Sequence, residues 1–90
     1  MAKIRIPTPL RKLTNDAEMV SSDAGSLKDA IDGLEGQYPG IKERLCDEQG
    51  EIRRFVNIYV NGEDVRFLDN VNTKLGPNDD VSIVPAVAGG

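Results

Sequence analysis

The chemistry with the clearest sequence signal lies at the carboxyl terminus, where the chain ends Ala86-Val87-Ala88-Gly89-Gly90. All five residues are small or apolar, and none carries a side-chain charge. Two terminal glycines make a slim, conformationally permissive tail. Such a tail could enter a narrow enzyme channel and present only its carboxylate, since Gly90 has no Cβ to obstruct attack on the carboxyl carbon. The alternative is a frayed terminus that happens to end in glycine.

The rest of the chain lacks the residues for catalysis of its own. It has no histidine and a single cysteine. This excludes a Ser-His or Cys-His pair, an internal disulfide and a four-thiolate metal site. Cys46 has apolar neighbours in the sequence, and we interpret it as a small, partly buried apolar residue. We therefore expect no catalytic residue, no metal site and no bound cofactor.

Size and charge narrow the class of protein further. Ninety residues form one small domain, with no apolar run long enough for a membrane span and no signal peptide, so we expect a cytoplasmic protein without membrane contact. A net charge of −4 argues against nucleic-acid binding and suits a basic partner surface. The basic residues near the start are interpreted as solvated charge; they are Lys3, Arg5, Arg11 and Lys12.

Periodicity predicts an order of elements. Alternation at 3–6 and a weaker pattern at 17–22 predict a strand hairpin. Ser26 is a good N-cap for a helix that ends near Gly36 and Pro39-Gly40. A helical turn at 41–45 follows. The later segments predict a strong strand at 55–60, an Asn61-Gly62 turn, a short strand at 65–67 and a last strand at 80–85.

This order predicts an α+β fold in which one main helix packs on one face of a mixed sheet. The predicted core face contains Ile4, Ile6, Val56, Ile58, Val60, Val81 and Ile83. The opposite face contains Phe55, Asn57, Tyr59, Ser82 and Val84, and no further segment remains to cover it. That face is either a partner-binding patch or ordinary cross-strand packing of half-exposed aromatics.

Two stretches carry a resemblance to a known family. They are Phe55-Val-Asn-Ile-Tyr-Val-Asn-Gly-Glu-Asp-Val-Arg-Phe67 and Asp80-Val-Ser-Ile-Val-Pro-Ala-Val-Ala-Gly-Gly90, with a further similarity at Ile6-Pro7-Thr8-Pro9-Leu10-Arg11. Together they resemble the ubiquitin-like sulfur carriers of the ThiS/MoaD family, most of all the branch that serves cysteine biosynthesis. The resemblance covers nearly the whole chain. It implies a β-grasp domain at 1–85 followed by a flexible diglycine tail at 86–90.

The resemblance also implies a function. An E1-like adenylyltransferase and sulfurtransferase would use ATP to activate the Gly90 carboxylate and convert it to a thiocarboxylate. The carrier would then donate sulfide to a PLP-dependent cysteine synthase, and a metalloprotease would release cysteine. Gly89 and Ala88 would complete the tail. In this sequence the family's docking residues correspond to Arg11, Phe67 and Val84. We add Tyr59, because it lies on the same predicted face of the sheet as Val84.

Three other functions stay open at the level of sequence. The chain could be the small subunit of molybdopterin synthase, with its tail held in a larger subunit. It could be a ubiquitin-like modifier that forms isopeptide bonds to lysines. It could also be a plain interaction domain whose tail has no role.

Overall fold

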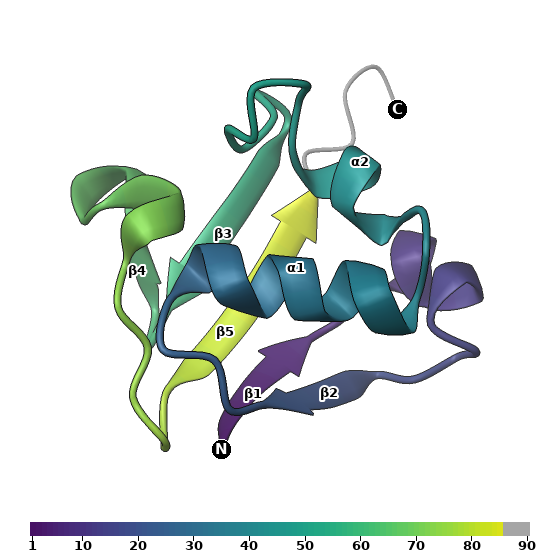
Figure 1. Ribbon diagram of the computed structural model, residues 1–90, viewed down its shortest axis with the longest axis horizontal. Coiled ribbons are helices and arrows are strands. Elements are labelled where there is room, and N and C mark those ends of the chain that lie inside the picture. The colour runs from purple at the N-terminus through teal and green to yellow at the C-terminus, as the bar shows by residue number, and fades with distance from the viewer. Residues whose placement is uncertain (86–90) are drawn as a thin grey trace.

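The strands form one mixed five-stranded sheet in the order β2-β1-β5-β3-β4 (Figure 1). The computed structural model describes residues 1–85, so the predicted tail, with Ala88, Gly89 and Gly90, lies outside the described residues. The strands are β1 (Ala2–Arg5), β2 (Met19–Ser22), β3 (Val56–Val60), β4 (Glu63–Asp64) and β5 (Asp80–Pro85). The central strand β5 runs parallel to β1 and antiparallel to β3.

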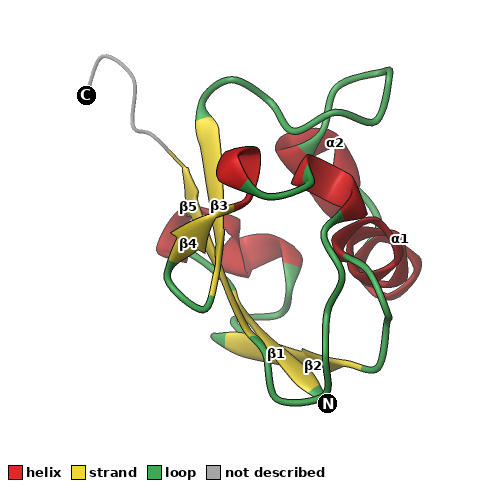
Figure 2. Cartoon of the chain, turned by 90° about the vertical axis from the view of Figure 1, so that its left-hand side faces the viewer, coloured by secondary structure: helices red, strands yellow, loops and turns green. Residues whose placement is uncertain are grey.

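The helices α1 (Leu27–Gln37) and α2 (Ile41–Leu45) lie on one side of the sheet (Figure 2). The predicted N-cap of α1 is confirmed, because Ser26 Oγ accepts a hydrogen bond of 3.2 Å from the Asp29 backbone N–H. Gly36 does not end α1, which continues to Gln37. The carboxylate of Glu35 then accepts hydrogen bonds from the backbone N–H groups of Gly40 and Lys42, and this joins α1 to α2.

The core lies between these helices and the sheet. All seven predicted core residues are buried: Ile4, Ile6, Val56, Ile58, Val60, Val81 and Ile83. They alternate along their strands with residues on the other face, as the pleat requires. The buried helix positions are also those expected from the 3.6-residue period: Leu27, Ala30, Ile31 and Leu34. The predicted α+β architecture is therefore confirmed.

The prediction of a strand at 65–67 is wrong. The antiparallel pairing of β3 with β4 stops at Asp64, and Val65–Phe67 is a 3-10 helix, η2. The Asp64 carboxylate caps η2 by accepting a hydrogen bond of 2.9 Å from the Arg66 backbone N–H. The apolar-polar-apolar pattern of these three residues fits a strand equally well, so only this local cap distinguishes the two structures. Another 3-10 helix, η3 (Asn70–Asn72), follows.

The two-residue turn between β3 and β4 also holds the start of β5. Asn61 and Gly62 both have positive φ, 53° and 85°, as a type I′ hairpin turn requires. The Asn61 side chain donates a hydrogen bond of 2.9 Å to Asp79 Oδ1, and its Oδ1 accepts one of 3.0 Å from the Asp80 backbone N–H. Asp79 Oδ2 accepts a further hydrogen bond of 2.7 Å from the Gly76 N–H.

These contacts make stability depend on pH through Asp79. The hydrogen bonds from Gly76 and then Asn61 hold the pKa of the Asp79 carboxyl below its ordinary value of 3.8. The ionised form therefore stabilises the fold at pH values above 3.8, and this contribution is lost as pH falls through the lower pKa of the folded state. We expect Asp79→Asn to unfold at lower urea concentration than the wild type at neutral pH. The difference should shrink in acid; parallel loss of stability in both proteins would contradict this assignment.

Candidate functional site

The candidate site begins where β5 ends. The last pair between β5 and β3 joins Pro85 to Val56, and the parallel pairing of Arg5 with Ser82 brings the end of β1 to the same end of the sheet. We call this end of the sheet the exit end, because the chain continues from Pro85 here (Figure 1). β5 is paired with β1 as far as Ser82 and with β3 as far as Pro85, so the sheet fixes the position of Pro85.

One face of the sheet is not covered by α1 or α2 (Figure 2). We call it the open face; its side chains are those of Lys3, Arg5, Met19, Ser21, Asn57, Tyr59, Asp80, Ser82 and Val84. Val84 is 45% exposed, and Tyr59 is half-buried. Phe55, which directly precedes β3 at the exit end, is 57% exposed. Apolar surface of this kind next to Pro85 suits contact with a partner.

The four predicted docking residues fall in three places. Tyr59 and Val84 lie on the open face of neighbouring strands, opposite Ser82 and Asn57 respectively, so the structure brings them together. Arg11 lies in the 3-10 helix η1 (Thr8–Leu13), and its Nε donates a hydrogen bond of 3.1 Å to the Ile6 carbonyl, which places it beside the exit end. Phe67 lies apart from them, in η2 beyond the edge strand β4, and is 83% exposed.

Arg66 is a residue whose role the sequence pattern missed. Its guanidinium donates hydrogen bonds of 2.7 Å to the Val56 carbonyl, 3.2 Å to the Arg53 carbonyl and 2.7 Å to Asn57 Oδ1. Because β4 pairs only with Tyr59 and Val60, the start of β3 would otherwise be an unpaired edge. Arg66 therefore satisfies the carbonyl groups of that edge and anchors η2, with Phe67, against the sheet. An alternating pattern treats this position only as an exposed strand residue.

Removing these contacts should destabilise the domain measurably. We expect Arg66→Ala to lower the free energy of unfolding by about 2 kcal/mol, since hydrogen bonds from a charged donor contribute about 1.5–3 kcal/mol. Arg66→Lys keeps the charge but loses the planar fork, so its stability should fall between the two. Urea unfolding followed by circular dichroism measures the effect. A loss below about 0.5 kcal/mol in Arg66→Ala, the range of ordinary surface substitutions, would contradict the anchoring role.

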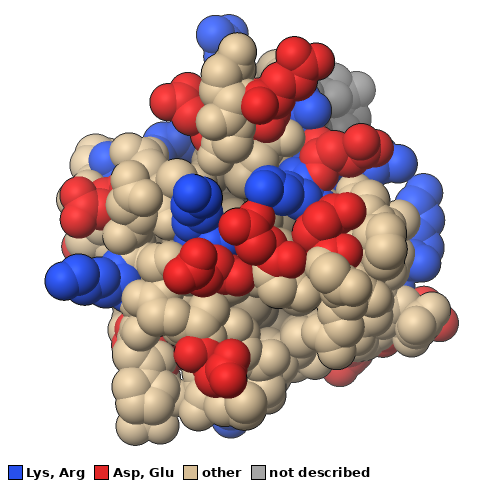
Figure 3. Space-filling view, in the orientation of Figure 1, with Lys and Arg blue, Asp and Glu red and all other residues tan. Residues whose placement is uncertain are grey.

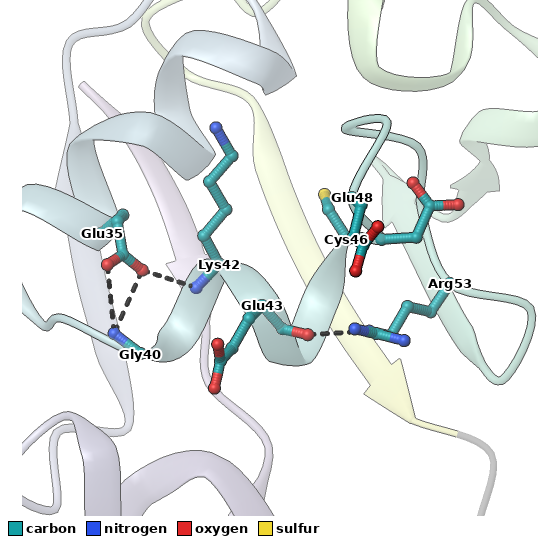
Figure 4. A pocket seen from close by; sticks show the side chains of 8 residues that line it. Glu35, Gly40, Lys42, Glu43, Cys46, Glu48 and Arg53 are labelled. Atoms are coloured by element: carbon teal, nitrogen blue, oxygen red, sulfur yellow. Dashed lines mark hydrogen bonds between the residues drawn. The ribbon is translucent and has the colours of Figure 1, made fainter.

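A shallow pocket lies between α1, α2 and the segment before β3 (Figure 4). Its walls are already joined to one another, through the contacts of Glu35 described above and a 2.7 Å hydrogen bond from Arg53 Nε to the Glu43 carbonyl. Cys46 lines the pocket but is only 3% exposed, and burial raises the pKa of its thiol. A protonated, buried thiol is a poor nucleophile, which supports the interpretation of Cys46 as an apolar core residue.

Within residues 1–85, no cluster of three His, Cys, Asp or Glu side chains is arranged to bind a metal ion. None of the helices in that part of the chain is long and apolar enough to cross a bilayer.

Comparison with known proteins covers nearly the whole chain. The family model described as "ThiS family" matches residues 4–90. The sulfur carrier protein CysO of Mycobacterium tuberculosis is 48% identical over 89 residues, which span 97% of this chain and 96% of the relative. A crystal structure of CysO from that species superposes with a TM-score of 0.91 at 45% identity, covering 97% of this chain and 100% of the other.

Two other matches bear on function. A chain in the crystal structure of the Amycolatopsis orientalis BexX/CysO complex has a TM-score of 0.94 and 39% identity, with full coverage of both chains. Small archaeal modifier protein 3 of Haloferax volcanii is 41% identical over 68 residues, 76% of this chain and 73% of the relative. The predicted β-grasp fold and the predicted similarity to ubiquitin-like sulfur carriers are confirmed by these matches, and the chain belongs to the ThiS family.

Proposed function

We propose that this protein carries sulfur as a thiocarboxylate on Gly90. The observation that carries the proposal is the reach of the family match, which extends from residue 4 to residue 90 and so includes the diglycine. The relatives that match over nearly the full chain are named as carriers, which agrees with the expectation of a substrate of partner enzymes and not a catalyst. The fold supports it further, since β5 ends at an exit end beside an open face.

The proposed reaction has two steps on the Gly90 carboxylate. A carboxylate is a poor electrophile, because attack on it must expel oxide. The carboxylate first attacks the α-phosphorus of ATP and releases pyrophosphate, which gives an acyl adenylate with a good leaving group. A sulfide equivalent then attacks the carbonyl carbon, AMP leaves, and a thiocarboxylate and a proton remain. An E1-like adenylyltransferase would supply the catalytic groups and bind the ATP, so the carrier itself needs no cofactor.

The thiocarboxylate is suited to sulfur donation. It is ionised at neutral pH and has a soft, nucleophilic sulfur, so it needs no general base on the carrier. That property fits a chain with no histidine. The proposed acceptor is a PLP-dependent cysteine synthase, followed by a metalloprotease that releases cysteine. The use of ATP places the proposed reaction in the cytoplasm.

Intact-mass measurement tests the proposal. The protein is incubated with its activating enzyme, ATP and sulfide. We expect a mass increase equal to the exchange of one oxygen for sulfur, located on Gly90 by fragmentation. The matched control omits ATP and should show no change. An unchanged mass in the presence of an enzyme that consumes ATP on a known carrier would reject the proposal.

Protein modification is a second candidate function. The identity with small archaeal modifier protein 3 favours it, although that match covers a smaller part of the chain. Conjugates would appear as higher bands on denaturing gels that resist thiol reagents and disappear with the Gly90 deletion. Isopeptide-linked lysines in digests of those bands would establish this function.

A further inference from the structure

The charge of the molecule is divided between its two sides. Residues 26–53, which form α1, α2 and the loop before β3, contain seven acidic and four basic residues, a net charge of −3. This one segment therefore holds most of the net charge of −4 of the whole chain. Acidic side chains are spread over this side in the space-filling view (Figure 3). The excess negative charge belongs to the helical side of the molecule.

The remaining residues together carry a charge of only −1, and the open face itself is slightly positive. Arg5 is paired with Asp80, with its Nε 3.2 Å and its Nη2 3.3 Å from the two carboxylate oxygens. Arg66 reaches the Asn57 side chain on this face and lies 3.7 Å from the Asp64 carboxylate. Lys3 is exposed and makes no ion pair with the described residues 1–85. On this face Lys3, Arg5 and Arg66 stand against the carboxylates of Asp80 and Asp64, which leaves an excess of one positive charge.

The exit end adds two more arginines. Arg54 lies in the turn directly before β3, is exposed, and forms no hydrogen bond or ion pair through its side chain within residues 1–85. Its neighbour Arg53 is different, because its Nε is held by the Glu43 carbonyl on the helical side. On the other flank, Arg11 lies 3.8 Å from a well-exposed Glu18 carboxylate, a weak pairing. Two arginine residues are therefore placed in the segments on either side of the end of β5.

We infer that the surface of the activating partner that receives the exit end is acidic, and that Arg54 is a docking residue for it. The inference rests on the proposed function. The total charge predicts a basic partner, but fields are screened over about 8 Å at physiological ionic strength, so contact is governed by local charge. A cation that loses water at an interface needs an anionic partner, and Arg54 has none on its own chain. The division of charge also orients the exit end toward an acidic surface during approach.

Nucleic acid would offer negative charge too, but a protein fits better. The open face and exit end expose Val84 and Phe55, which suit an apolar protein interface. The acidic helical side would repel a phosphate backbone that extends past the domain. The acidic surface is therefore assigned to a protein.

Two charge reversals test the inference. Arg54→Glu and Lys28→Glu change the net charge equally, but Lys28 is exposed in the first turn of α1, where a carboxylate is compatible with the helix dipole. The affinity and association rate for the activating enzyme are measured at low and high salt. We expect Arg54→Glu to weaken binding by about tenfold or more, mainly through a slower association rate. Lys28→Glu should stay within about twofold of the wild type, and added salt should weaken wild-type binding more than that of Arg54→Glu.

The outcomes separate this inference from the proposed function. If the two variants reduced the affinity equally, or if the wild type bound more tightly at high salt, the inference of an acidic partner surface would be overturned. Binding of a fluorescent oligonucleotide that Arg54→Glu abolishes would overturn the assignment to a protein. Thiocarboxylate formation is measured separately at saturating enzyme, where Arg54→Glu should still be converted. If the wild type bound with the expected salt dependence but never formed a thiocarboxylate, the proposed function would be rejected. The inference of an acidic partner surface would then still stand.

Discussion

Deletion of Gly90 should abolish thiocarboxylate formation and leave the domain folded. The deletion moves the terminal carboxylate back by one residue, about 3.5 Å in an extended chain. A misplacement of about 1 Å in a reacting group already costs up to about 100-fold in rate. In the proposed reaction the activating enzyme would bind the domain and the nucleotide at fixed positions, so we expect conversion to fall by at least about 100-fold. Intact mass after incubation with enzyme, ATP and sulfide gives the converted fraction.

A length-preserving variant is the matched control for this deletion. Gly90→Ala retains the reach of the tail and adds a Cβ beside the carboxyl carbon, so it separates reach from steric access. Both variants should unfold at the wild-type urea concentration, because the core and the last described strand pair, Val56 with Pro85, are unchanged. Normal conversion of the deleted protein would show that the carboxylate of Gly90 is not the reacting group.

Ile58→Ala should produce a large loss of stability by removing a buried side chain from the sheet. Ile58 is 0% exposed and lies at the middle of β3, opposite Ile83 of the central strand. Truncation of a buried isoleucine to alanine costs about 2–5 kcal/mol, from lost burial and from the cavity left behind. We expect about 3–4 kcal/mol here, since the paired central strand β5 and the helices above the sheet limit relaxation. That is a large part of the roughly 5–15 kcal/mol by which small domains are stable.

Ile58→Val is the control, with an expected loss of about 0.5–1.5 kcal/mol. Urea unfolding followed by circular dichroism measures both variants. The folded fraction of Ile58→Ala should still be converted to the thiocarboxylate at saturating enzyme, because Ile58 faces the helices and not the open face. A loss below about 1 kcal/mol in Ile58→Ala would show that the core around β3 relaxes to fill the cavity.

Strand periodicity and caps predicted most of the fold. Each core residue at 56, 58 and 60 lies where strict alternation places it, and the Ser26 cap marks the start of α1. These signals are local, so they survive in a single sequence. The strand predicted at 65–67 is wrong, because a pattern of only three residues fits a strand and a 3-10 helix equally well. The Asp64 side chain caps this segment and favours the 3-10 helix.

The candidate site was predicted less completely. Tyr59 and Val84 share the open face as alternation requires. Arg66 was missed, because its partners at Val56 and Arg53 lie ten and thirteen residues away and depend on how η2 folds back. The total charge does not report on local charge, since Arg53 is held by the Glu43 carbonyl, whereas its neighbour Arg54 forms no side-chain hydrogen bond or ion pair within residues 1–85.

The sequence by itself was enough to predict the group proposed to react, because the diglycine at 89–90 is uncharged and the chain has no histidine. Only the tertiary structure decided what surrounds the start of that tail. Long-range strand pairing places β5 between β1 and β3, and it thereby brings Arg11 and Arg54, 43 positions apart in the sequence, to the two flanks of one end of the sheet. Periodicity reports on which face a residue lies, but not on which strands are neighbours, because pairing depends on contacts between distant segments.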